Sequence, residues 1–460
     1  MQELFVRDPY TGETIEKLKL HSPEVLQRTL QRALEKFTTW RFSPAHERAR
    51  VLEHVAAQLT ARKSEFASLI RREAGKPITL AEIEVDRAIS VLYWAAGEAQ
   101  RFGGEILRLD AQTSGRPGFG MHTRFARGVV LGITPFNFPL NLVVHKIAPA
   151  VACGCPIVIK PSPYAPLTAL KIASLFEEAQ PGLVQVALAD DAATAKLTQA
   201  REIATLSFTG SANVGWKIRK QAPEKPTTLE LGGNAWVAVL DDADPSSLPA
   251  TAKRIARGAF AYAGQSCISV QNVAVHKSRW KEMRELLAAE TEALPFGDPS
   301  NRDVISGPVI HEQAAERIRA TLKSQAVTIR SRQCLGAKRE GAAVIAPTLV
   351  ELGTDAGDSS LTQDELFGPA LNLIAINSVD ELVTRINSSR FGLQAGVYTN
   401  HWPTIERLYR ELEVGGLVIN DVPTTRFDHQ PYGGVKESGQ GREGVRYAME
   451  SMTESKFLAL

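Results

Sequence analysis

The chain has 460 residues, which is too many for one hydrophobic core and enough for two large lobes. Its hydrophobic content of 44% and charged content of 23% are ordinary for a globular protein. Lys and Arg number 53 against 51 Asp and Glu, and this balance of +2 does not favour nucleic acid or an anionic membrane surface as a partner.

The sequence shows no sign of export, of a membrane span or of a metal. The first residues, MQELFVRDPYTGETIEKL, carry acids and no apolar core, so we expect no signal peptide. No apolar run approaches the ~20 residues of a spanning helix. Cys153, Cys155, Cys267 and Cys334 do not make a disulfide framework in so long a chain, and no Cys and His cluster has zinc-ligand spacing. We therefore expect a cytoplasmic protein with reduced thiols and no metal site.

The first hundred residues are predicted to be helical. In the segment 22–37, Ser22 is a plausible N-cap, a proline follows, and apolar residues recur at helical spacing. The next predicted helix, within 63–77, stops at Gly75, shortly before a second proline. A longer helix with one apolar face follows over 79–102.

From about residue 125, short β-branched runs alternate with helical patterns, from GVVLGITP through PIVIKPS to ATLSFTGS. This rhythm predicts an α/β protein with a parallel, doubly wound sheet, an architecture that binds nucleotides at the carboxyl ends of its strands. A second alternating block from 235 to 420 predicts a second α/β lobe. The polar stretch 110–125 and the tail after Gly441 fit neither lobe and are typical of an arm and its partner segment at a subunit contact.

Two segments at predicted strand ends could bind a nucleotide. In SFTGSANVG, a strand runs into Gly210 and Ser211 before a helix begins, and backbone N–H groups at such a turn can receive a phosphate. The GxGxxG fingerprint is absent, and an ordinary strand–helix turn explains this segment equally well. In KPSPYAP, Lys160 ends an apolar strand, where it can bind ribose hydroxyls or a phosphate, or simply reach solvent.

Three further segments supply candidate catalytic side chains. In TPFNFP, prolines and phenylalanines hold Asn137 in a dry turn, which suits stabilisation of an oxyanion, although such an Asn is usually only a turn residue. In LELGGN, apolar neighbours desolvate Glu230 and raise its pKa, which suits a general base; a strand-end Glu facing water is the alternative. In AGQSCIS, Cys267 lies between small and polar residues, so an exposed reactive turn competes with a buried inert thiol.

Seven segments follow one another along the chain: TPFNFP, KPS, SFTGS, LELGGN, GQSC, ELFGP and NDVPTTRFDHQPYGGVKESGQGREG. Their order, and the 37 positions between Glu230 and Cys267 (267 − 230), resemble the aldehyde dehydrogenase superfamily over nearly the whole chain. The resemblance implies that Cys267 attacks an aldehyde to give a thiohemiacetal, while Asn137 and the Cys267 N–H hold the oxyanion. It implies further that hydride passes to a nicotinamide and that water activated by Glu230 hydrolyses the resulting thioester.

The resemblance also implies NAD or NADP as the cofactor. Lys160 is expected at the adenosine ribose, Ser211 at the pyrophosphate, and Glu365 and Phe367 of ELFGP at the nicotinamide ribose and ring. The full expected set is Thr134, Phe136, Lys160, Ser162, Gly210, Ser211, Gly232, Glu365 and Phe367. Many NAD-using members have a Glu three residues after the Lys of KPS, but here that position is Pro163. Because its absence removes repulsion toward a ribose 2′-phosphate, we expect NADP to be accepted at least comparably to NAD.

The resemblance to the aldehyde dehydrogenase superfamily implies that the chain has three parts. A Rossmann-type dinucleotide-binding domain comprises 1–110 and 131–232, and an α/β catalytic domain comprises 233–440. A small β oligomerisation arm comprises 111–130 and 441–460. Such arms extend the sheet of a partner subunit, so a homodimer or a homotetramer is expected.

The tail, together with PLNLVVHKIAP, is similar to bacterial and archaeal members that act on short oxygenated or anionic aldehydes. Lactaldehyde, non-phosphorylating glyceraldehyde 3-phosphate and phosphonoacetaldehyde dehydrogenases are the nearest of these. His145 and Arg426 are candidates to face such a substrate; a packed histidine and a structurally paired arginine are the alternatives for the two positions.

Three other functions compete with this interpretation. A CoA-acylating member would not need Glu230 as a base. A non-catalytic protein of the same fold would not need to keep Cys267, Glu230 and Asn137 together. A cysteine hydrolase without cofactor would leave KPS and ELFGP unexplained.

Overall fold

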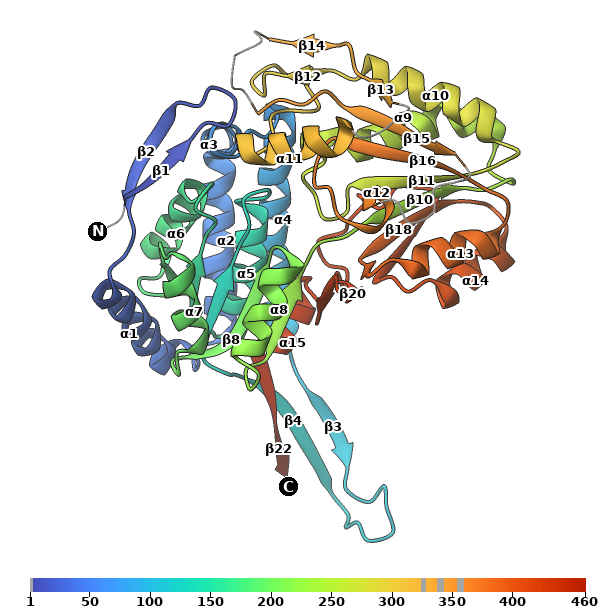
Figure 1. Ribbon diagram of the computed structural model, residues 1–460. Coiled ribbons are helices and arrows are strands. Elements are labelled where there is room, and N and C mark those ends of the chain that lie inside the picture. Colours follow the sequence, from blue (N-terminus) through green and yellow to red (C-terminus); the bar gives the residue numbers. More distant parts are fainter. Residues whose placement is uncertain (1–2, 324–327, 337–342, 354–359) are drawn as a thin grey trace.

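The two stretches of alternating strands and helices build two separate sheets, one in each lobe of the molecule (Figure 1). The structure is a computed structural model that describes residues 3–323, 328–336, 343–353 and 360–460. An arm projects from the first lobe, and the C-terminal strand lies in it (Figure 1). The expected α/β class with two lobes and a β arm is confirmed.

The first lobe contains a six-stranded sheet. Its strands, in spatial order, are β21 (Gly439–Gln440), β9 (Thr227–Glu230), β8 (Ile203–Thr209), β5 (Val129–Ile133), β6 (Ile157–Lys160) and β7 (Val184–Val186). All except β21 are parallel to their neighbours. The chain moves outward from β5 in one direction and returns to β8 on its other side. The carboxyl ends of β5 and β8 therefore flank a topological switch point, where ligands bind in open α/β sheets.

Nine helices of the described chain belong to this lobe. They are α1 (Pro23–Trp40), α2 (Ala45–Ala61), α3 (Lys63–Ala74), α4 (Ile78–Arg101), α5 (Asn141–Cys153), α6 (Leu167–Ala179), α7 (Asp191–Gln199), α8 (Ala212–Gln221) and α15 (Val445–Met452). The predicted start of α1 is correct, since the Ser22 side chain accepts a hydrogen bond from the Val25 N–H. The predicted stop of α3 is also correct, with Gly75 in the left-handed conformation at φ 66°.

The second lobe contains a seven-stranded sheet. Its spatial order is β13 (Thr328–Arg330), β15 (Thr348–Gly353), β16 (Ala370–Ile376), β11 (Val270–His276), β10 (Ala235–Val239), β18 (Gln394–Tyr398) and β19 (Gly416–Ile419). Only the β13 pairing is antiparallel. Its helices are α9 (Leu248–Phe260), α10 (Trp280–Ala293), α11 (Glu312–Lys323), α12 (Ser360–Gln363), α13 (Val379–Ser388) and α14 (Trp402–Glu411). Two short 3-10 turns, η1 (Pro245–Ser247) and η2 (Ala261–Gly264), flank α9.

The arm is a three-stranded antiparallel sheet of β3 (Glu105–Arg108), β4 (Phe119–Ala126) and β22 (Thr453–Ala459). The observed elements differ from the expected boundaries, and two of these differences concern β3 and α15. Strand β3 lies in the arm although it falls within 1–110, and α15 packs in the first lobe's core although it falls within 441–460. The reason for the second difference is that α15 presents buried apolar residues to α5.

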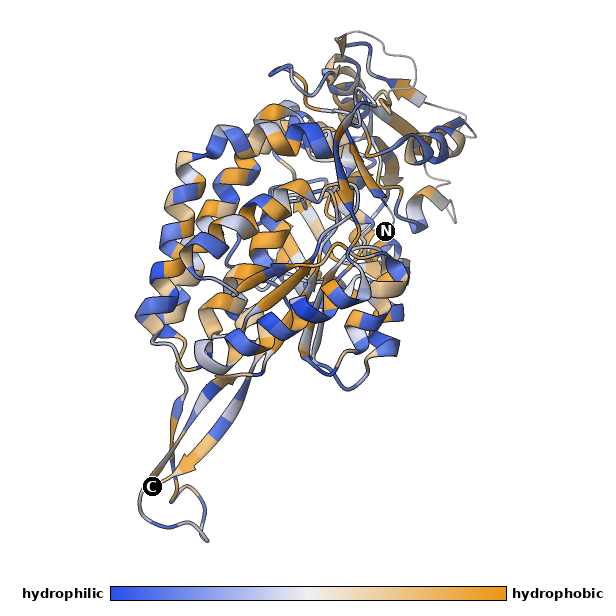
Figure 2. Cartoon of the chain, turned by 90° about the vertical axis from the view of Figure 1, so that its left-hand side faces the viewer, coloured by the Kyte–Doolittle hydropathy of each residue, from blue (hydrophilic) through white to orange (hydrophobic). Residues whose placement is uncertain are grey.

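Three two-stranded pairs complete the fold: β1 (Glu3–Arg7) with β2 (Thr14–Lys19), β12 (Phe296–Gly297) with β14 (Cys334–Leu335), and β17 (Phe391–Gly392) with β20 (Val435–Lys436). The β1–β2 hairpin departs from the prediction that the first hundred residues are helical. Figure 2 shows hydrophobic residues gathered on the strands and on one side of the surrounding helices. Across the described ranges, no helix combines the length and the apolar character needed to cross a membrane.

Candidate active site

A cavity of about 550 Å³ lies between the two lobes. Its first wall consists of the segments that follow β5, β6, β8 and β9, at the carboxyl edge of the first sheet. Its second wall comes from the second lobe and includes Ser266–Ile268, Glu365, Arg426 and Tyr432. The cavity therefore lies at the place where the sheet topology predicts a ligand.

Cys267 reaches this cavity because the chain turns sharply after α9. Tyr262 and Ala263 have positive φ angles of 52° and 54°, and Gly264 follows at 67°. A Cβ on Gly264 would lie 2.2 Å from the carbonyl oxygen of Gly368, so only glycine fits there. The turn leaves Cys267 half-buried in the cavity wall, just before β11 begins.

The thiol of Cys267 makes one side-chain hydrogen bond among the described residues. Its Sγ lies 3.1 Å from the Tyr432 hydroxyl. Burial raises the pKa of the Cys267 thiol to about 12, while the Tyr432 hydrogen bond and the Arg426 charge act in the opposite direction. The thiol is therefore mostly protonated at neutral pH.

Asn137 lies in the turn between β5 and α5 and is buried. Its Nδ2 donates a hydrogen bond of 2.9 Å to the carbonyl oxygen of Gln265. The turn itself is held by Glu84, whose carboxylate accepts hydrogen bonds from the Leu140 and Asn141 N–H groups at 2.9 and 3.1 Å. The amide is thus fixed beside the turn that carries Cys267, and its second N–H makes no hydrogen bond to the other described residues.

Glu230 ends β9 and is buried at the cavity wall. Burial, together with the negative charge of Glu443, raises its pKa well above the usual range, against the lowering effects of Arg426 and Lys146. The glycine pair after it allows a close approach of the two lobes, because a Cβ on Gly233 would lie 2.4 Å from the Cys267 carbonyl oxygen. LELGGN therefore packs directly against the turn that carries Cys267.

The expected residues of the adenosine half lie around the carboxyl ends of β6 and β8. Lys160 and Ser162 are buried and line the cavity. Burial lowers the pKa of Lys160, and the charges of Asp191 and Asp190 counteract this. Ser211 precedes α8 without capping it through its side chain, so the first N–H groups of α8 remain open to an anion.

Gly210 joins β8 to this helix and also lines the cavity. At the carboxyl end of β5, Thr134 lines the cavity, and its buried Oγ1 has no hydrogen-bond partner in the described part of the chain.

The residues expected at the nicotinamide half of the cofactor also line the cavity. The Glu365 carboxylate accepts a hydrogen bond of 3.0 Å from the Gly233 N–H, and burial raises its pKa to about 7. A Cβ on Gly232 would lie 2.3 Å from Glu365 Oε2, so any larger residue there would displace the Glu365 carboxylate. Phe367 has a strained φ of 52° and meets the Phe136 ring edge to face at 6.0 Å. Buried donors, an open helix end and an aromatic wall together fit a dinucleotide.

The two expected substrate residues differ in position. His145 is buried in α5 outside the cavity lining, and its Nε2 lies 3.1 Å from Asp428 Oδ1. Burial lowers its pKa, while the nearby carboxylates counteract this. For this residue the structure favours the alternative, a packed and hydrogen-bonded histidine. Arg426 does line the cavity, but its Nη2 donates to Glu443 Oε1 at 2.7 Å, so much of its charge is already paired.

Several residues of the site are not among those singled out from the sequence. Lys146 in α5 donates to Ser207, Thr209 and Glu443 at 3.0, 2.8 and 3.5 Å. A lysine inside the otherwise apolar NLVVHKIAPAVAC is a detectable signal, because a buried charge requires partners. Arg87 on α4 lines the cavity and binds Asp428 at 2.5 Å.

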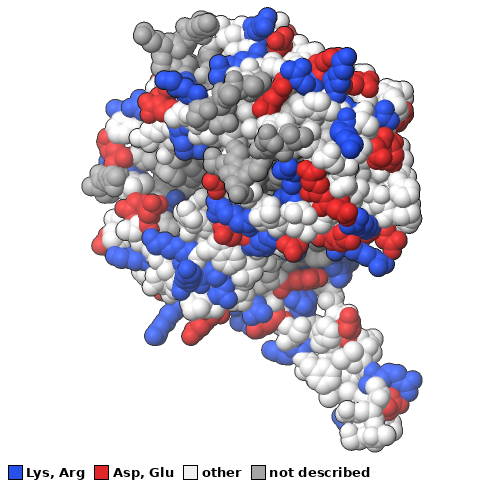
Figure 3. Space-filling model, turned by 45° about the vertical axis from the view of Figure 1, so that its right-hand side comes forward, with Lys and Arg blue, Asp and Glu red and all other residues white. Residues whose placement is uncertain are grey.

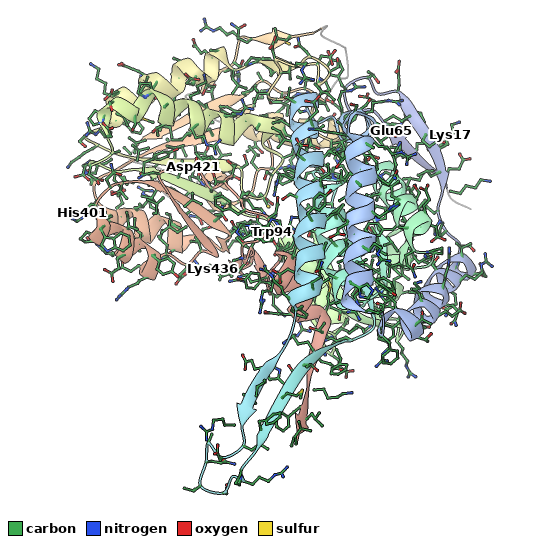
Figure 4. All side chains as sticks on the ribbon, turned by 180° about the vertical axis from the view of Figure 1, so that it is seen from behind. Lys17, Glu65, Trp94, His401, Asp421 and Lys436 are labelled. Atoms are coloured by element: carbon green, nitrogen blue, oxygen red, sulfur yellow. The ribbon has the colours of Figure 1, made fainter. Side chains whose placement is uncertain are left out.

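The loop that carries Arg426 and Tyr432 is attached to α4 at two points. One is the Arg87–Asp428 ion pair, and the other is the Trp94 ring, which stacks on His429 with 4.6 Å between centroids. Trp94 lies on the side of α4 that faces the second lobe (Figure 4). Elsewhere, basic and acidic side chains are interspersed over the face in Figure 3, in line with the small net charge. No group of His, Cys, Asp and Glu with metal-binding geometry occurs in the ranges that the structure describes.

A comparison with known families identifies the family to which this chain belongs. The model of the aldehyde dehydrogenase family matches residues 2–458. The chain belongs to the aldehyde dehydrogenase family. The expected enzyme class, an oxidoreductase acting on an aldehyde group, is confirmed by this membership.

Relatives within the aldehyde dehydrogenase family extend over the full chain. The 3-sulfolactaldehyde dehydrogenase of Priestia megaterium is 37% identical over 462 residues, covering 100% of this chain and 95% of the relative. The lactaldehyde dehydrogenase of Methanococcus maripaludis strain S2 is 34% identical and covers 100% and 97%. The glyceraldehyde-3-phosphate dehydrogenase GapN of Methanocaldococcus jannaschii, complexed with NADP, superposes with a TM-score of 0.91 at 33% identity and covers 99% and 98%. The expected likeness to lactaldehyde and glyceraldehyde 3-phosphate dehydrogenases is thereby confirmed.

Proposed function

We propose that the protein oxidises an aldehyde to a carboxylic acid with NAD or NADP, through a covalent intermediate on Cys267 that Glu230-activated water hydrolyses. The observation that carries this proposal is the meeting of Cys267, Asn137 and Glu230 on one cavity, which all nine expected cofactor residues also line. The reacting thiol, the oxyanion donor, the base and the cofactor residues therefore face a common space.

The covalent step begins at the sulfur of Cys267. The thiolate attacks the carbonyl carbon, the C–S bond forms, and the negative charge moves to the aldehyde oxygen. The free N–H of Asn137 and the backbone N–H of Cys267 donate to this oxyanion. A bound nicotinamide dinucleotide supplies a hydride acceptor, and after this oxidation Cys267 carries a thioester.

Hydrolysis of the thioester requires a base. Glu230 in its carboxylate form takes a proton from water, and the water oxygen attacks the thioester carbon. The C–S bond breaks, the acid leaves, and Cys267 is regenerated as a thiolate. The desolvated position of Glu230 makes its carboxylate a stronger base than an exposed one.

The cofactor assignment rests on residues of this chain and on one relative. Lys160 and the open N-terminus of α8 suit the ribose and phosphates, while Glu365 and Phe367 suit the nicotinamide half. The GapN relative was crystallised with NADP. Pro163 supplies no carboxylate against a 2′-phosphate, although Asp191 lines the same cavity from the start of α7.

We propose a short oxygenated or anionic aldehyde as the substrate. The relatives described above are dehydrogenases of sulfolactaldehyde, lactaldehyde and glyceraldehyde 3-phosphate, which are short aldehydes with oxygen-bearing or anionic substituents. Arg87 and Arg426 both line the cavity and supply positive charge. Arg87 uses Nε and Nη2 on Asp428, and its Nη1 has no hydrogen bond to other described residues, so it is the better candidate to receive an anionic group.

We also propose that the arm joins subunits into a homodimer or homotetramer. The arm exposes large apolar side chains on strands that project from the lobe, and these favour burial against another copy (Figure 1). These residues are Ile106, Leu107, Phe119, Phe125, Phe457 and Leu458. Light scattering after size exclusion tests this; a monomer at micromolar concentration would contradict it.

A cytoplasmic location is the last part of the proposal. All four cysteines are unpaired, and free thiols of this kind persist in a reducing compartment. Fractionation of the cells that produce the protein, followed by an assay of the dinucleotide reduction described next, tests the location.

Dinucleotide reduction by the purified protein tests the function. NAD and NADP are supplied in parallel, without CoA, with lactaldehyde, glyceraldehyde 3-phosphate, succinic semialdehyde and benzaldehyde. Turnover that forms the carboxylic acid and is abolished in Cys267→Ala is the expected result. Turnover that persists in that variant would contradict the role of Cys267, and a requirement for CoA would indicate an acylating enzyme.

A further inference from the structure

The phenol of Tyr432 touches the sulfur that the proposed reaction uses, yet none of the steps above requires it. Its hydroxyl oxygen lies 3.1 Å from the Cys267 Sγ. The Tyr432 side chain is 3% exposed, so water has little access to compete for this contact. We propose that Tyr432 is a catalytic residue, which donates its phenolic O–H to the Cys267 thiolate and thereby increases the fraction of sulfur ready to attack. This deepens the proposed function and rests on Cys267 being its nucleophile.

The direction of the hydrogen bond follows from the charge state. When both groups are neutral, either the thiol or the phenol can donate. Once the thiol has lost its proton, only the phenol of Tyr432 has a proton to donate. Burial raises the pKa of Tyr432 well above its usual range, so the phenol keeps this proton. The resulting O–H···S⁻ bond has a charged acceptor and is stronger than a neutral one.

Arg426 strengthens this donor. Its guanidinium carbon lies 3.8 Å from the centre of the Tyr432 ring, and its Nη2 is held by Glu443 at 2.7 Å. A cation on the face of the ring withdraws electron density from the phenol and makes the O–H a better donor. The same positive charge stabilises the thiolate directly, since Arg426 is among the groups that oppose the rise in the Cys267 pKa.

The backbone holds Tyr432 in place before any substrate arrives. Its N–H donates to the Glu443 carbonyl at 2.9 Å, and the Glu443 N–H donates back to the Tyr432 carbonyl at 2.6 Å. Glu443 therefore positions both Tyr432, through its main chain, and Arg426, through its carboxylate. These backbone bonds hold the donor at the sulfur, so no rearrangement is needed when the thiolate forms.

The proton balance is simple. The thiol proton of Cys267 leaves to water in the cavity, and the phenolic proton stays on Tyr432. When the sulfur bonds to the carbonyl carbon, its negative charge moves to the aldehyde oxygen, and the bond from Tyr432 weakens. Tyr432 therefore favours the reactive form of the enzyme without being consumed or oxidised.

Alkylation of the ligand-free protein by iodoacetamide tests the proposal without an aldehyde or a cofactor. The thiolate forms a C–S bond, the C–I bond breaks, and iodide leaves. The rate at Cys267, followed by mass spectrometry over roughly pH 6 to 9, reports the thiolate fraction. In Tyr432→Phe we expect this rate to be about tenfold lower at neutral pH, because a hydrogen bond to a charged group is lost.

Two further variants separate donation from structural support. Tyr398→Phe removes a buried tyrosine hydroxyl of the same lobe, at a described position outside the cavity lining, and should leave the alkylation rate unchanged. Replacement of Tyr432 by 3-fluorotyrosine keeps the shape and makes the phenol a stronger donor, so the rate should exceed that of the natural protein. This variant also answers the question if Tyr432→Phe does not fold.

An alkylation rate in Tyr432→Phe equal to or above the natural one would overturn the proposal, because the thiol would then be donating to the phenol. So would a fluorotyrosine protein that reacts no faster than the natural protein. The proposed function fails separately, through dinucleotide reduction that survives in Cys267→Ala, whatever the alkylation rates are.

Discussion

The side-chain amide of Asn137 donates a hydrogen bond of 2.9 Å to the backbone carbonyl of Gln265, two residues before Cys267. This bond joins the turn after β5 in the first lobe to the nucleophile turn of the second. Because the acceptor is a main-chain atom, this bond does not depend on the identity of the side chain at position 265. One amide hydrogen makes this bond, and the other remains for the oxyanion.

Replacement of Asn137 by Ala should therefore damage the chemical step. We expect kcat/KM for the best aldehyde to fall about 100-fold to 1,000-fold, as for loss of one oxyanion donor. Steady-state dinucleotide reduction measures this. Asn137→Asp, which keeps the size but offers a negative charge, should be at least as poor. An Ala variant within about threefold of the natural rate would exclude Asn137 from the oxyanion site.

Replacement of Glu230 by Gln should separate the two halves of the reaction. Formation of the thioester does not use Glu230 as a base, whereas its hydrolysis does. A stopped-flow trace should keep its rapid burst of reduced dinucleotide, followed by turnover about 100-fold slower than in the natural protein. A burst that disappears together with the turnover would show instead that Glu230 acts before the thioester.

The pH dependence of turnover should reflect the ionisation of Glu230. Burial, followed by the charge of Glu443, raises the pKa of Glu230 well above its usual range, so Glu230 gains its basic form at a higher pH than an exposed carboxyl group does. We therefore expect kcat to increase as pH rises from about 6 until Glu230 loses its proton. This increase should be absent in Glu230→Gln. A kcat that falls over the same interval would contradict a general base with a raised pKa.

Position 163 should control the choice between NAD and NADP. Pro163→Glu introduces a carboxylate beside Lys160, and we expect it to weaken NADP binding about tenfold or more while NAD binding changes little. Pro163→Gln is the matched neutral control. Fluorescence titration of the two dinucleotides measures both affinities without turnover. For the natural protein, an affinity or efficiency strongly favouring NAD would contradict the expected acceptance of NADP.

Asp191 lines the same cavity near Lys160 and would repel a 2′-phosphate if one binds there. Asp191→Asn should therefore shift the ratio of affinities, measured by the same titration, toward NADP. An unchanged ratio would place the phosphate elsewhere.

Arg87 and Arg426 should differ in selectivity. Arg87→Gln should raise KM for an anionic aldehyde about 10-fold to 100-fold more than KM for a neutral aldehyde, because Arg87 has a nitrogen free of described partners. Arg426→Lys should lower kcat for both aldehydes alike, since Arg426 is bound to Glu443 and stacked on Tyr432. A loss in Arg426→Lys confined to the anionic aldehyde would return Arg426 to the role of a substrate residue.

The elements with strong local signals could be predicted from the sequence. Ser22 and Gly75 mark their helix ends through capping chemistry, which acts within a few residues. The short β-branched runs that form β5, β6 and β8 are as recognisable, because buried parallel strands need continuous apolar residues. In contrast, the β1–β2 hairpin carries polar, largely exposed residues and lacks such a run.

The residues of the candidate site also differ in how far the sequence alone could predict them. Cys267, Glu230 and Asn137 are each ambiguous alone, and only the order of the motifs suggests that they meet. Tyr432 and Glu443 act through contacts with residues far away in the chain: the Tyr432–Cys267 contact spans 165 positions and the Glu443–Lys146 contact spans 297. Local sequence patterns contain no information on such distances. For His145 the structure favours the packed alternative that the sequence left open, and the partner Asp428 that indicates this lies 283 positions away.

The division of the site between lobes has a practical consequence. Cys267 belongs to one sheet domain, and Asn137 and Glu230 belong to the other, so neither domain holds a working set of groups. A small displacement of one domain relative to the other would abolish activity although both sheets remain folded. A stored or heated sample can then be inactive although its circular dichroism is unchanged. Titration of the reactive thiol, rather than a spectrum, is the appropriate measure of how much intact enzyme a preparation contains.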